Sequence, residues 1–391
     1  MKRSVLLVGV LVVAVAFTVL ARIQPHTGPN AAAGTLGRAA PAAPSPPPPT
    51  PTVSTAPPVD PDSFFTPTRL APGQRPPQFI VVSFDGAGSH QKWDYWRRVA
   101  ERSHMRFTGF LSGIYLVGSE HRTAYRGPGH SPGRASIGFP ATADVPALIS
   151  DLNEAWRRGY EIGTHYNGHF CSGAGYSGGQ WTTADWSSEL NQFFGFYRSY
   201  RQINQDPTMP TLEVPASSIK GGRTPCLEDR PDQLMPALRK YALSYDSSGI
   251  QDGLAWPKRN GYRIWEFPMA YVPMPGRPNG VVSMDYNFWV KQTGSPPRAG
   301  NSVADSQQVI ATYRRMYEAA YQGNRAPLIL GNHFNSWNNN AYTAALTSFV
   351  QDYCGRPDTY CVPYRDVIRW METQDPTVLT RLQNLPAVDT V

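Results

Sequence analysis

Two histidines are the first candidates for chemistry in this chain. His165 and His169 lie four positions apart in the segment YEIGTHYNGHFC, directly after a short apolar run that starts at Tyr160. Neutral imidazole is the commonest protein ligand for divalent metals, and two imidazoles reach one ion when the chain curls between them. Asn167 and Gly168 favour such a loop over a continuing helix. On its own the pair is weak evidence, because loop histidines at this spacing also arise by chance.

Other chemically capable side chains also follow apolar runs. Asp85 ends the run that starts at residue 78, Asp246 follows the run 242–245, and His333 lies near the end of the run 326–334. The carboxyl ends of parallel strands are where functional residues gather in α/β folds. A carboxylate can take a proton from a metal-polarised water, and an imidazolium can protonate a leaving amine or alcohol. The set therefore predicts a hydrolytic site.

Arg223 lies in a loop rich in glycine and proline. An arginine in such a loop is most often a solvated charge, but a guanidinium also orients carboxylates through paired hydrogen bonds. We expect Arg223 to lie near the site.

The elements that would position these residues alternate along the chain. Apolar periodicity predicts strands and helices in turn, and we find no repeat of fixed period. About three hundred residues of such alternation suit one βα barrel. The predicted strands cover 78–84, 107–117, 160–164, 212–215, 242–245 and 326–334, and the predicted helices cover 92–105, 140–158, 182–205, 233–241 and 303–321.

The domain organisation follows from composition. Residues 1–22 begin with two basic residues, continue through an apolar run and end at Arg22, as a signal peptide or membrane anchor does, and 4–21 would form the tether. Residues 23–75 are a linker rich in Pro, Ala, Ser and Thr that we expect to be disordered. Residues 76–375 form the expected catalytic domain, and 376–391 a C-terminal tail.

Charge and cysteine content indicate which partners the protein could bind and whether its cysteines form disulfides. The formal charge of +7 suits an anionic partner such as a wall polymer, a membrane or nucleic acid. Nucleic acid is disfavoured, because no basic block with interleaved aromatic residues appears. An exported chain with four cysteines favours disulfides over buried thiols. Three pairings are formally open, and we expect Cys354 with Cys361 and Cys171 with Cys226.

These motifs resemble those of the polysaccharide deacetylase family, the NodB-homology carbohydrate esterases, over about residues 77–370. The chitin-deacetylase-like branch is the most similar. The resemblance implies a distorted (β/α) barrel of seven or eight strands. It rests on Ser83-Phe84-Asp85-Gly86, His165-Tyr166-Asn167-Gly168-His169, Arg223-Thr224-Pro225, Tyr245-Asp246-Ser247-Ser248, Trp256-Pro257, Trp265-Glu266-Phe267-Pro268 and Leu330-Gly331-Asn332-His333.

The resemblance also implies roles for individual residues. Three aromatic side chains, Trp256, Trp265 and Tyr166, are expected to bind substrate. The two tryptophans would stack on sugar faces, and the alternative role for their aromatic stretches is core packing. Asp85 would be the general base and His333 the general acid. His165 and His169 would bind the metal. Arg223 would orient Asp85, and Asp246 would tune His333 or Arg223.

Two features depart from the family pattern. Leu330-Gly331-Asn332-His333 differs in spacing from the usual Leu-x-His of the last motif, and the second departure, at a metal ligand, is the serious one. The family's third metal ligand is a second aspartate after Asp85, and here that position is Gly86. Losing a bond and a negative charge lowers affinity for a dication. We expect a weakly held divalent metal, zinc first, with cobalt and nickel as alternatives. Asp85 or Asp94 moving in as a ligand is a further alternative.

The expected function is an exported, metal-dependent polysaccharide deacetylase. It would hydrolyse the amide of N-acetylated, chitin-like or peptidoglycan-like glycans, at the cell surface or outside the cell, as a monomer. Two alternatives remain open: a glycan-binding protein of this fold with little or no activity, and an O-acetyl esterase on polysaccharide. Amide and ester substrates pass through the same kind of tetrahedral oxyanion, so the residues do not separate them.

Overall fold

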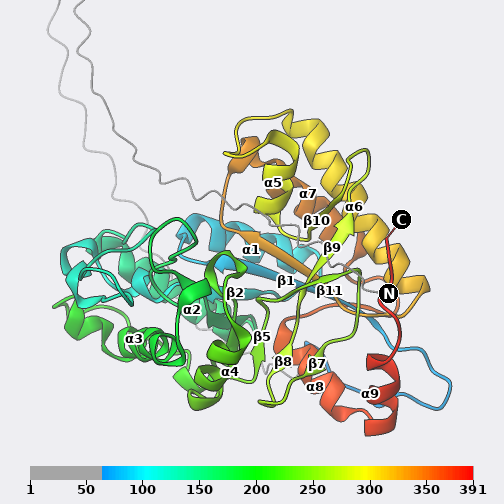
Figure 1. Ribbon diagram of the computed structural model, residues 1–391, viewed down its shortest axis with the longest axis horizontal. Coiled ribbons are helices and arrows are strands. Elements are labelled where there is room, and N and C mark those ends of the chain that lie inside the picture. The colour runs from blue at the N-terminus through cyan, green and yellow to red at the C-terminus, as the bar shows by residue number, and fades with distance from the viewer. Residues whose placement is uncertain (1–63, 391) are drawn as a thin grey trace, which may run out of the picture. The chain divides into compact units, whose positions relative to one another are not determined.

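A curled, mostly parallel sheet forms the centre of the fold, as Figure 1 shows for this computed structural model. The structure describes residues 64–390. The sheet has nine strands, in the order β11-β1-β2-β3-β4-β5-β8-β7, with β12 also paired to β1, and only β7 runs antiparallel to its neighbour. The strands are β1 (Gln78–Gly86), β2 (Thr108–Leu111), β3 (Glu161–Thr164), β4 (Gly221–Gly222), β5 (Tyr245–Asp246), β7 (Lys258–Arg259), β8 (Trp265–Glu266), β11 (Leu328–His333) and β12 (Thr359–Cys361).

Helices alternate with these strands because their sequences carry caps and one apolar face. In the first helix, Ser89 caps the N-terminus, and Trp93, Trp96, Val99 and Ala100 form the buried face. The helices are α1 (His90–Arg102), α2 (Val145–Arg157), α3 (Thr183–Ile203), α4 (Pro231–Lys240), α5 (Asp285–Thr293), α6 (Ser302–Gln322), α7 (Trp337–Tyr353), α8 (Tyr364–Thr373) and α9 (Pro376–Gln383). Single 3₁₀ turns cover Gly113–Leu116, Ser119–Ala124, Thr142–Asp144, Gly178–Gln180, Ala216–Ser218 and Pro225–Leu227.

A second, smaller sheet interrupts the alternation of strands and helices between β5 and α6, and its first strand precedes β7 and β8 in the chain. Its strands are β6 (Ile250–Asp252), β9 (Met269–Pro273) and β10 (Gly280–Val282), in the order β10-β9-β6. After β10, Met284 forms an isolated bridge with Gly331 of β11, and α5 begins at the next residue. This insertion therefore delivers the first turn of α5 to the end of β11.

Strand register brings the predicted site residues to one edge of the sheet. In the parallel pair β1 and β11, Asp85 lies opposite His333. Thr164, the residue before His165, lies opposite Gly222, the residue before Arg223. The carboxyl ends of these strands thus meet at one edge, as predicted.

The sheet is a half-barrel. Among residues 64–390, no strand pairing joins β7 or β8 back to β11, so the curled sheet stays open on that side. This matches the expected distorted α/β barrel. The predicted strand 107–117 is wrong in part, because it ends at Leu111 and continues as the 3₁₀ turn Gly113–Leu116.

At both ends of the described domain, residues that composition assigned to the linker or the tail pack against the domain. Residues 1–22 and most of the predicted linker lie outside the described residues. Phe65, within the predicted linker, is 6% exposed and packs edge-on against Phe79 with ring centroids 5.6 Å apart. Arg75 donates to carbonyls at the end of α6. Downstream of 375 the chain forms α9, and Val388 pairs with Leu254.

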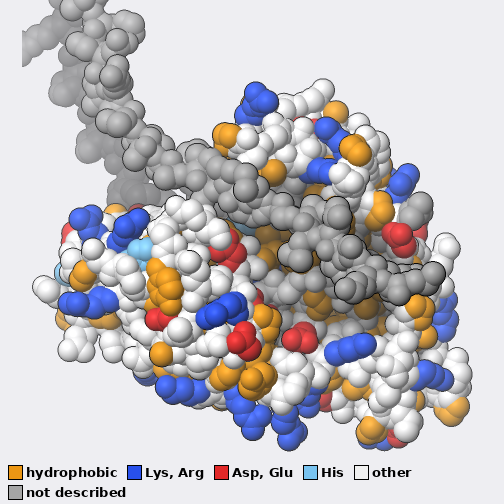
Figure 2. All heavy atoms as spheres, viewed as in Figure 1, with side chains coloured by type: hydrophobic (Ala, Val, Ile, Leu, Met, Phe, Trp, Pro, Cys, Tyr) orange, Lys and Arg blue, Asp and Glu red, His pale blue; other side chains and the backbone are white. Residues whose placement is uncertain are grey.

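The described helices contain none that is both long and apolar enough to cross a membrane. On the face drawn in Figure 2, lysine and arginine side chains are scattered, with acidic side chains between them.

Candidate active site

Asp85 and Arg223 form a buried ion pair at the end of β1. Arg223 Nη1 donates to Asp85 Oδ1 at 2.8 Å, and their side chains are 0% and 3% exposed. The guanidinium also donates to Ser83, Ser247 and Tyr364. Burial opposes ionisation of the Asp85 carboxyl, but the Arg223 charge and hydrogen bond and the nearby His165 and His333 together outweigh it and hold the pKa below the ordinary value. Asp85 is therefore an oriented, ionised carboxylate, the form that a general base requires.

The two histidines after β3 meet where the chain curls. Tyr166 and His169 have φ of +55° and +57°, and the rings of His165 and His169 lie 5.2 Å apart between centroids. Burial lowers the pKa of His165 to about 4 and that of His169 to about 3. Both imidazoles are thus neutral at neutral pH, as metal ligands must be.

His165 has an open lone pair. Its Nδ1 lies 2.8 Å from the Arg223 carbonyl, which can only accept, so Nδ1 carries the proton and Nε2 does not. Nε2 is buried and has no hydrogen-bond partner among the described residues. An orphaned, unprotonated imidazole nitrogen beside a second neutral imidazole fits a divalent metal.

His333, at the end of β11, is paired with an acid that the sequence analysis did not identify. Asp285, 1% exposed, accepts from the His333 backbone N–H and lies 2.7 Å from His333 Nδ1. Burial disfavours the imidazolium, but the Asp285 carboxylate outweighs it and raises the His333 pKa. His333 is therefore a suitable general acid, with its side chain 24% exposed.

These groups face one cavity of about 450 Å³. Its walls include Asp85, His165, His169 and His333. The structure therefore brings together four of the predicted site residues, while Arg223 lies behind Asp85. The other lining residues are Gly86, Ala87, Gly88, Ser89, Ser112, Tyr115, Ile137, Gly138, Phe139, Pro140, Phe334, Asn335 and Trp337.

Tyr115 lies beside the position where the family pattern would place a second aspartate. A Cβ on Gly86 would have the Tyr115 hydroxyl as its nearest neighbour, at 3.7 Å, and Gly86 has φ +85°. A Cβ on Gly88 would lie 2.4 Å from the Tyr115 ring, so only glycine admits the ring there. Burial raises the Tyr115 pKa, which keeps the phenol neutral. The cavity wall at Gly86 therefore presents a hydroxyl instead of a carboxylate.

Asp246 does not contact His333 in the way the sequence analysis allowed. Its two hydrogen bonds are to the backbone and hydroxyl of Ser248, at 3.0 and 2.7 Å. Burial raises its pKa to about 6. The carboxylate that tunes His333 is Asp285, and Asp246 affects Arg223 only through its charge.

The three aromatic residues predicted to bind substrate are buried, which contradicts that role. Trp256 is 2% exposed and donates to the Asn324 carbonyl, and Tyr166 is 1% exposed against Trp186. Trp265 is 3% exposed and lines a different hollow. Apolar sequence around a tryptophan does not tell a core ring from a surface ring.

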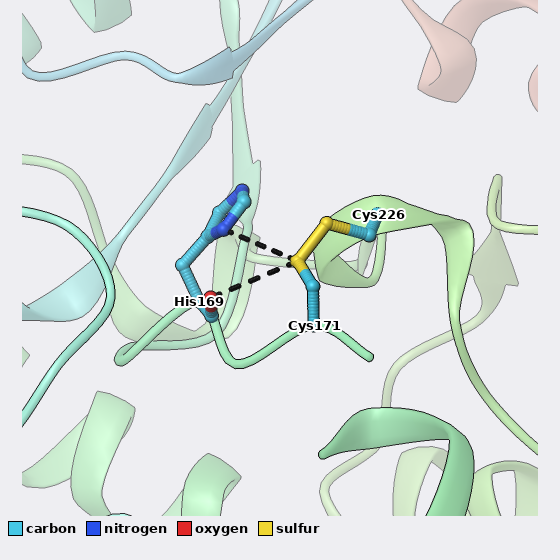
Figure 3. Close-up of side chains that lie close together, drawn as sticks. All are labelled: His169, Cys171 and Cys226. Carbon is cyan, nitrogen blue, oxygen red and sulfur yellow. Dashed lines mark hydrogen bonds between the residues drawn. A yellow bond between two sulfur atoms is a disulfide. The ribbon is translucent and has the colours of Figure 1, made fainter. Parts of the chain in front are cut away.

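Both predicted disulfides are present. Cys354 pairs with Cys361, and Cys171 pairs with Cys226. Figure 3 shows the second bridge beside His169, whose Nδ1 lies 3.6 Å from Cys171 Sγ. The sulfurs in this His-Cys-Cys group are bonded to each other, so they offer no thiolate to a metal. The bridge instead ties the histidine loop to the loop after Arg223.

A buried network supports the loop from behind. Glu189 of α3 is 0% exposed, accepts from Tyr125 at 2.7 Å and accepts from Asn167 at 2.9 Å. Burial raises the Glu189 pKa to about 7. Asn167 lies between the two histidines, so this network fixes the curl that brings their rings together.

The sequence analysis missed Asp285, Tyr115 and Glu189. Asp285 lies 48 residues before its partner His333, on an insertion that no strand–helix rule places. Tyr115 was assigned to a strand, and Glu189 was not singled out within the predicted helix 182–205. The glycines at 86 and 88 were the available signal for Tyr115, since glycine marks a close approach of other atoms.

Comparison with known proteins gives distant likenesses. No protein-family model and no curated protein matches the chain. Among solved structures, it is similar to a suggested polysaccharide deacetylase from Mycobacterium smegmatis, with 14% identity, TM-score 0.49 and coverage of 83% of this chain and 97% of that one. It is similar to a family 4 carbohydrate esterase from Streptomyces lividans, with 14% identity, TM-score 0.34 and coverage of 72% and 91%. It is also similar to the carbohydrate deacetylase Agd3, with 10% identity, TM-score 0.46 and coverage of 77% and 54%.

Polysaccharide deacetylases are thus among the structures that this chain resembles. With identities of 14% or less and TM-scores below 0.5, these likenesses do not carry the function. The function is inferred from the residues around the cavity.

Proposed function

We propose that this protein is a polysaccharide deacetylase. The observation that carries the proposal is the convergence of four groups on one cavity: an ionised Asp85, a His333 whose pKa is raised by Asp285, and two neutral imidazoles. A carboxylate base, an imidazole acid and neutral metal ligands around one cavity are the groups that acyl hydrolysis needs.

The side chains divide the proton transfers between them. A divalent metal held by His165 and His169 would polarise an acetyl carbonyl and acidify water. Asp85, fixed by Arg223, accepts the proton from the attacking water. His333 donates a proton from Nε2 to the leaving nitrogen or oxygen, since its Nδ1 is engaged by Asp285. Asp85 thus serves as the base and His333 as the acid, and the pKa of each is shifted by its buried partner, Arg223 or Asp285.

The substrate class we propose is an N-acetylated, chitin-like or peptidoglycan-like glycan. Zinc is the metal we expect, with cobalt or nickel as alternatives, and two imidazoles without an aspartate at Gly86 would hold it weakly. The two disulfides suit an extracellular or cell-surface protein. Asp246 stays a supporting residue of the Arg223 loop in this proposal.

The second candidate is a glycan-binding protein without catalysis. The neutral Tyr115 hydroxyl beside Gly86 favours it, because a phenol adds no negative charge to retain a dication. An O-acetyl esterase would use the same groups.

Acetate release tests the proposal. The full-length protein is incubated with N-acetylglucosamine oligomers and with O-acetylated xylose oligomers, with zinc, cobalt or nickel added. We expect acetate from the N-acetyl oligomers and a loss of about 100-fold or more in Asp85→Asn and in His333→Gln.

His104→Gln is the matched control, because His104 is an exposed imidazole outside the cavity. It should keep the wild-type rate. Acetate from the O-acetyl oligomers alone would identify the esterase. No acetate from either substrate, in a protein that still binds the oligomers, would favour the binding protein.

A further inference from the structure

Three aromatic side chains form a cluster next to the cavity. Trp289 of α5 stacks on Trp337 of α7 with ring centroids 5.0 Å apart and planes at 20°. Tyr286 meets the Trp337 ring edge-on at 5.6 Å. We name Tyr286, Trp289 and Trp337 the aromatic platform. It uses none of the three aromatic residues that the sequence analysis assigned to the substrate.

The platform is accessible to solvent. Tyr286 is 39% exposed, and Trp289 and Trp337 are only partly buried. Soluble proteins seldom leave several large aromatic rings together at the surface unless they bind something. Core packing therefore explains these three rings less well than it explains Trp256 or Tyr166.

The platform is continuous with the catalytic cavity. Trp337 lines the cavity and packs against the His333 ring with centroids 5.1 Å apart. Helices α5 and α7 lie side by side above the sheet (Figure 1). A ligand whose acyl group reached His333 would thus have its neighbouring units over Trp337 and Tyr286.

The platform is also fixed in position relative to the general acid. Asp285, which binds His333, is followed directly by Tyr286 and, one turn later, by Trp289. Asn335 donates to Asp285 and accepts from the Trp337 backbone N–H. One hydrogen-bonded unit therefore holds both the proton donor and the platform.

The turn after Trp337 has an unusual backbone conformation. Asn338, Asn339 and Asn340 have φ of +47°, +52° and +62°. Asparagine tolerates this left-handed conformation better than most residues, but three in succession are costly. Asn338 is tied to Gly300 and Asp305 by hydrogen bonds. The backbone is therefore strained at the start of α7, and hydrogen bonds hold it in the conformation that positions the Trp337 ring.

We propose that the aromatic platform is a binding site for the sugar units that adjoin the unit being deacetylated. The flat C–H face of a pyranose packs on the electron-rich face of an aromatic ring, while its hydroxyls stay in water. The site would select polymers over single sugars, and it would define a glycan chain running from the cavity across Trp337 to Tyr286. This inference rests on the proposed function.

Binding measured without turnover tests it. The full-length protein is titrated with N-acetylglucosamine and with its linear oligomers up to the hexamer, by calorimetry. We expect affinity to rise with length until the platform is covered. Tyr286→Ala should weaken binding of the longer oligomers by on the order of tenfold, with little change for the single sugar.

Two control variants make the test specific. Tyr286→Phe keeps the ring and should bind as the wild type does. Tyr262→Ala removes a tyrosine with the same 39% exposure on the loop between β7 and β8, and should also bind as the wild type does. Trp289→Phe, which keeps a smaller ring, should give an intermediate loss.

The outcomes separate this inference from the proposed function. Length-dependent binding that Tyr286→Ala reduces, in a protein that releases no acetate, supports the platform and overturns the deacetylase. Acetate release by a protein whose affinity for long oligomers is unaffected by Tyr286→Ala overturns the platform alone. Equal losses in Tyr286→Ala and Tyr286→Phe would overturn stacking as the mode of binding.

Discussion

The Asp85–Arg223 ion pair makes a quantitative prediction for the variant Arg223→Met. Methionine fills a similar volume but has no charge, so the Asp85 carboxylate, 4% exposed, loses its counter-ion. Hydroxyls of Ser83, Ser247 and Tyr364 lose their donor at the same time. Removing one partner of a buried pair leaves an uncompensated charge in a poorly solvated place.

The expected loss of folding stability in Arg223→Met is large. Breaking a buried ion pair from one side costs about 3–5 kcal/mol, which for a domain of this size lowers the Tm by roughly 4–7 °C. The double variant Asp85→Asn/Arg223→Met removes the stranded charge as well. It should lose less than the two single variants together, with a coupling energy of about 1 kcal/mol or more.

A surface pair provides the matched control. Arg314 and Asp352 are also 2.8 Å apart, but their side chains are 47% and 41% exposed. Arg314→Met should cost no more than about 1 kcal/mol, because water solvates the remaining carboxylate. Thermal unfolding by calorimetry at neutral pH compares the variants. A Tm for Arg223→Met no lower than that for Arg314→Met would refute the reasoning.

The same pair predicts a pH dependence. The folded pKa of Asp85 lies below its ordinary value of 3.8, so the ion pair stabilises the fold above that value. The stabilisation is lost as pH falls through the folded pKa. The Tm difference between wild type and Arg223→Met should therefore be full at neutral pH and shrink in acid. A difference that is constant, or that grows in acid, would contradict this sign.

Three further predictions concern single residues. Asp285→Asn removes the charge that raises the His333 pKa, so the alkaline limb of the rate–pH profile should move to lower pH, and an unmoved limb would show that Asp285 does not tune His333. The Glu189 pKa is raised from 4.5 to about 7, so the protein loses stability as pH rises across that window; Glu189→Gln should reduce this slope in Tm, and an unchanged slope would assign it to other groups. Gly86→Asp should tighten zinc binding about tenfold and cost about 1–2 kcal/mol of stability at φ +85°, whereas unchanged zinc affinity would show that the added carboxylate does not reach the ion.

Several site residues could be predicted from sequence because local pattern places them. Asp85, His165 and His333 each follow an apolar run, and parallel strands end at one edge of the sheet. The half-barrel follows from the same alternation. Arg223 follows a strand of only two residues, so it was placed by its motif and not by periodicity.

The features that sequence did not predict depend on contacts between segments far apart in the chain. Asp285 reaches His333 only because the small sheet of β6, β9 and β10 carries α5 to the end of β11. Trp256 and Trp289 have equally apolar neighbours in sequence, yet one is buried and the other lies partly exposed beside the cavity. Side-chain exposure is set by which elements pack over a residue, which a single sequence does not encode locally.

Metal binding by the histidine pair tests the central claim most directly. The full-length protein and the variant His165→Ala/His169→Ala are titrated with zinc by calorimetry, with His104→Ala as an exposed-histidine control. The account predicts one ion bound per chain, retained in the control and lost in the double variant. Equal zinc binding by the wild type and the double variant would contradict it, because the cavity would then hold no metal between its imidazoles.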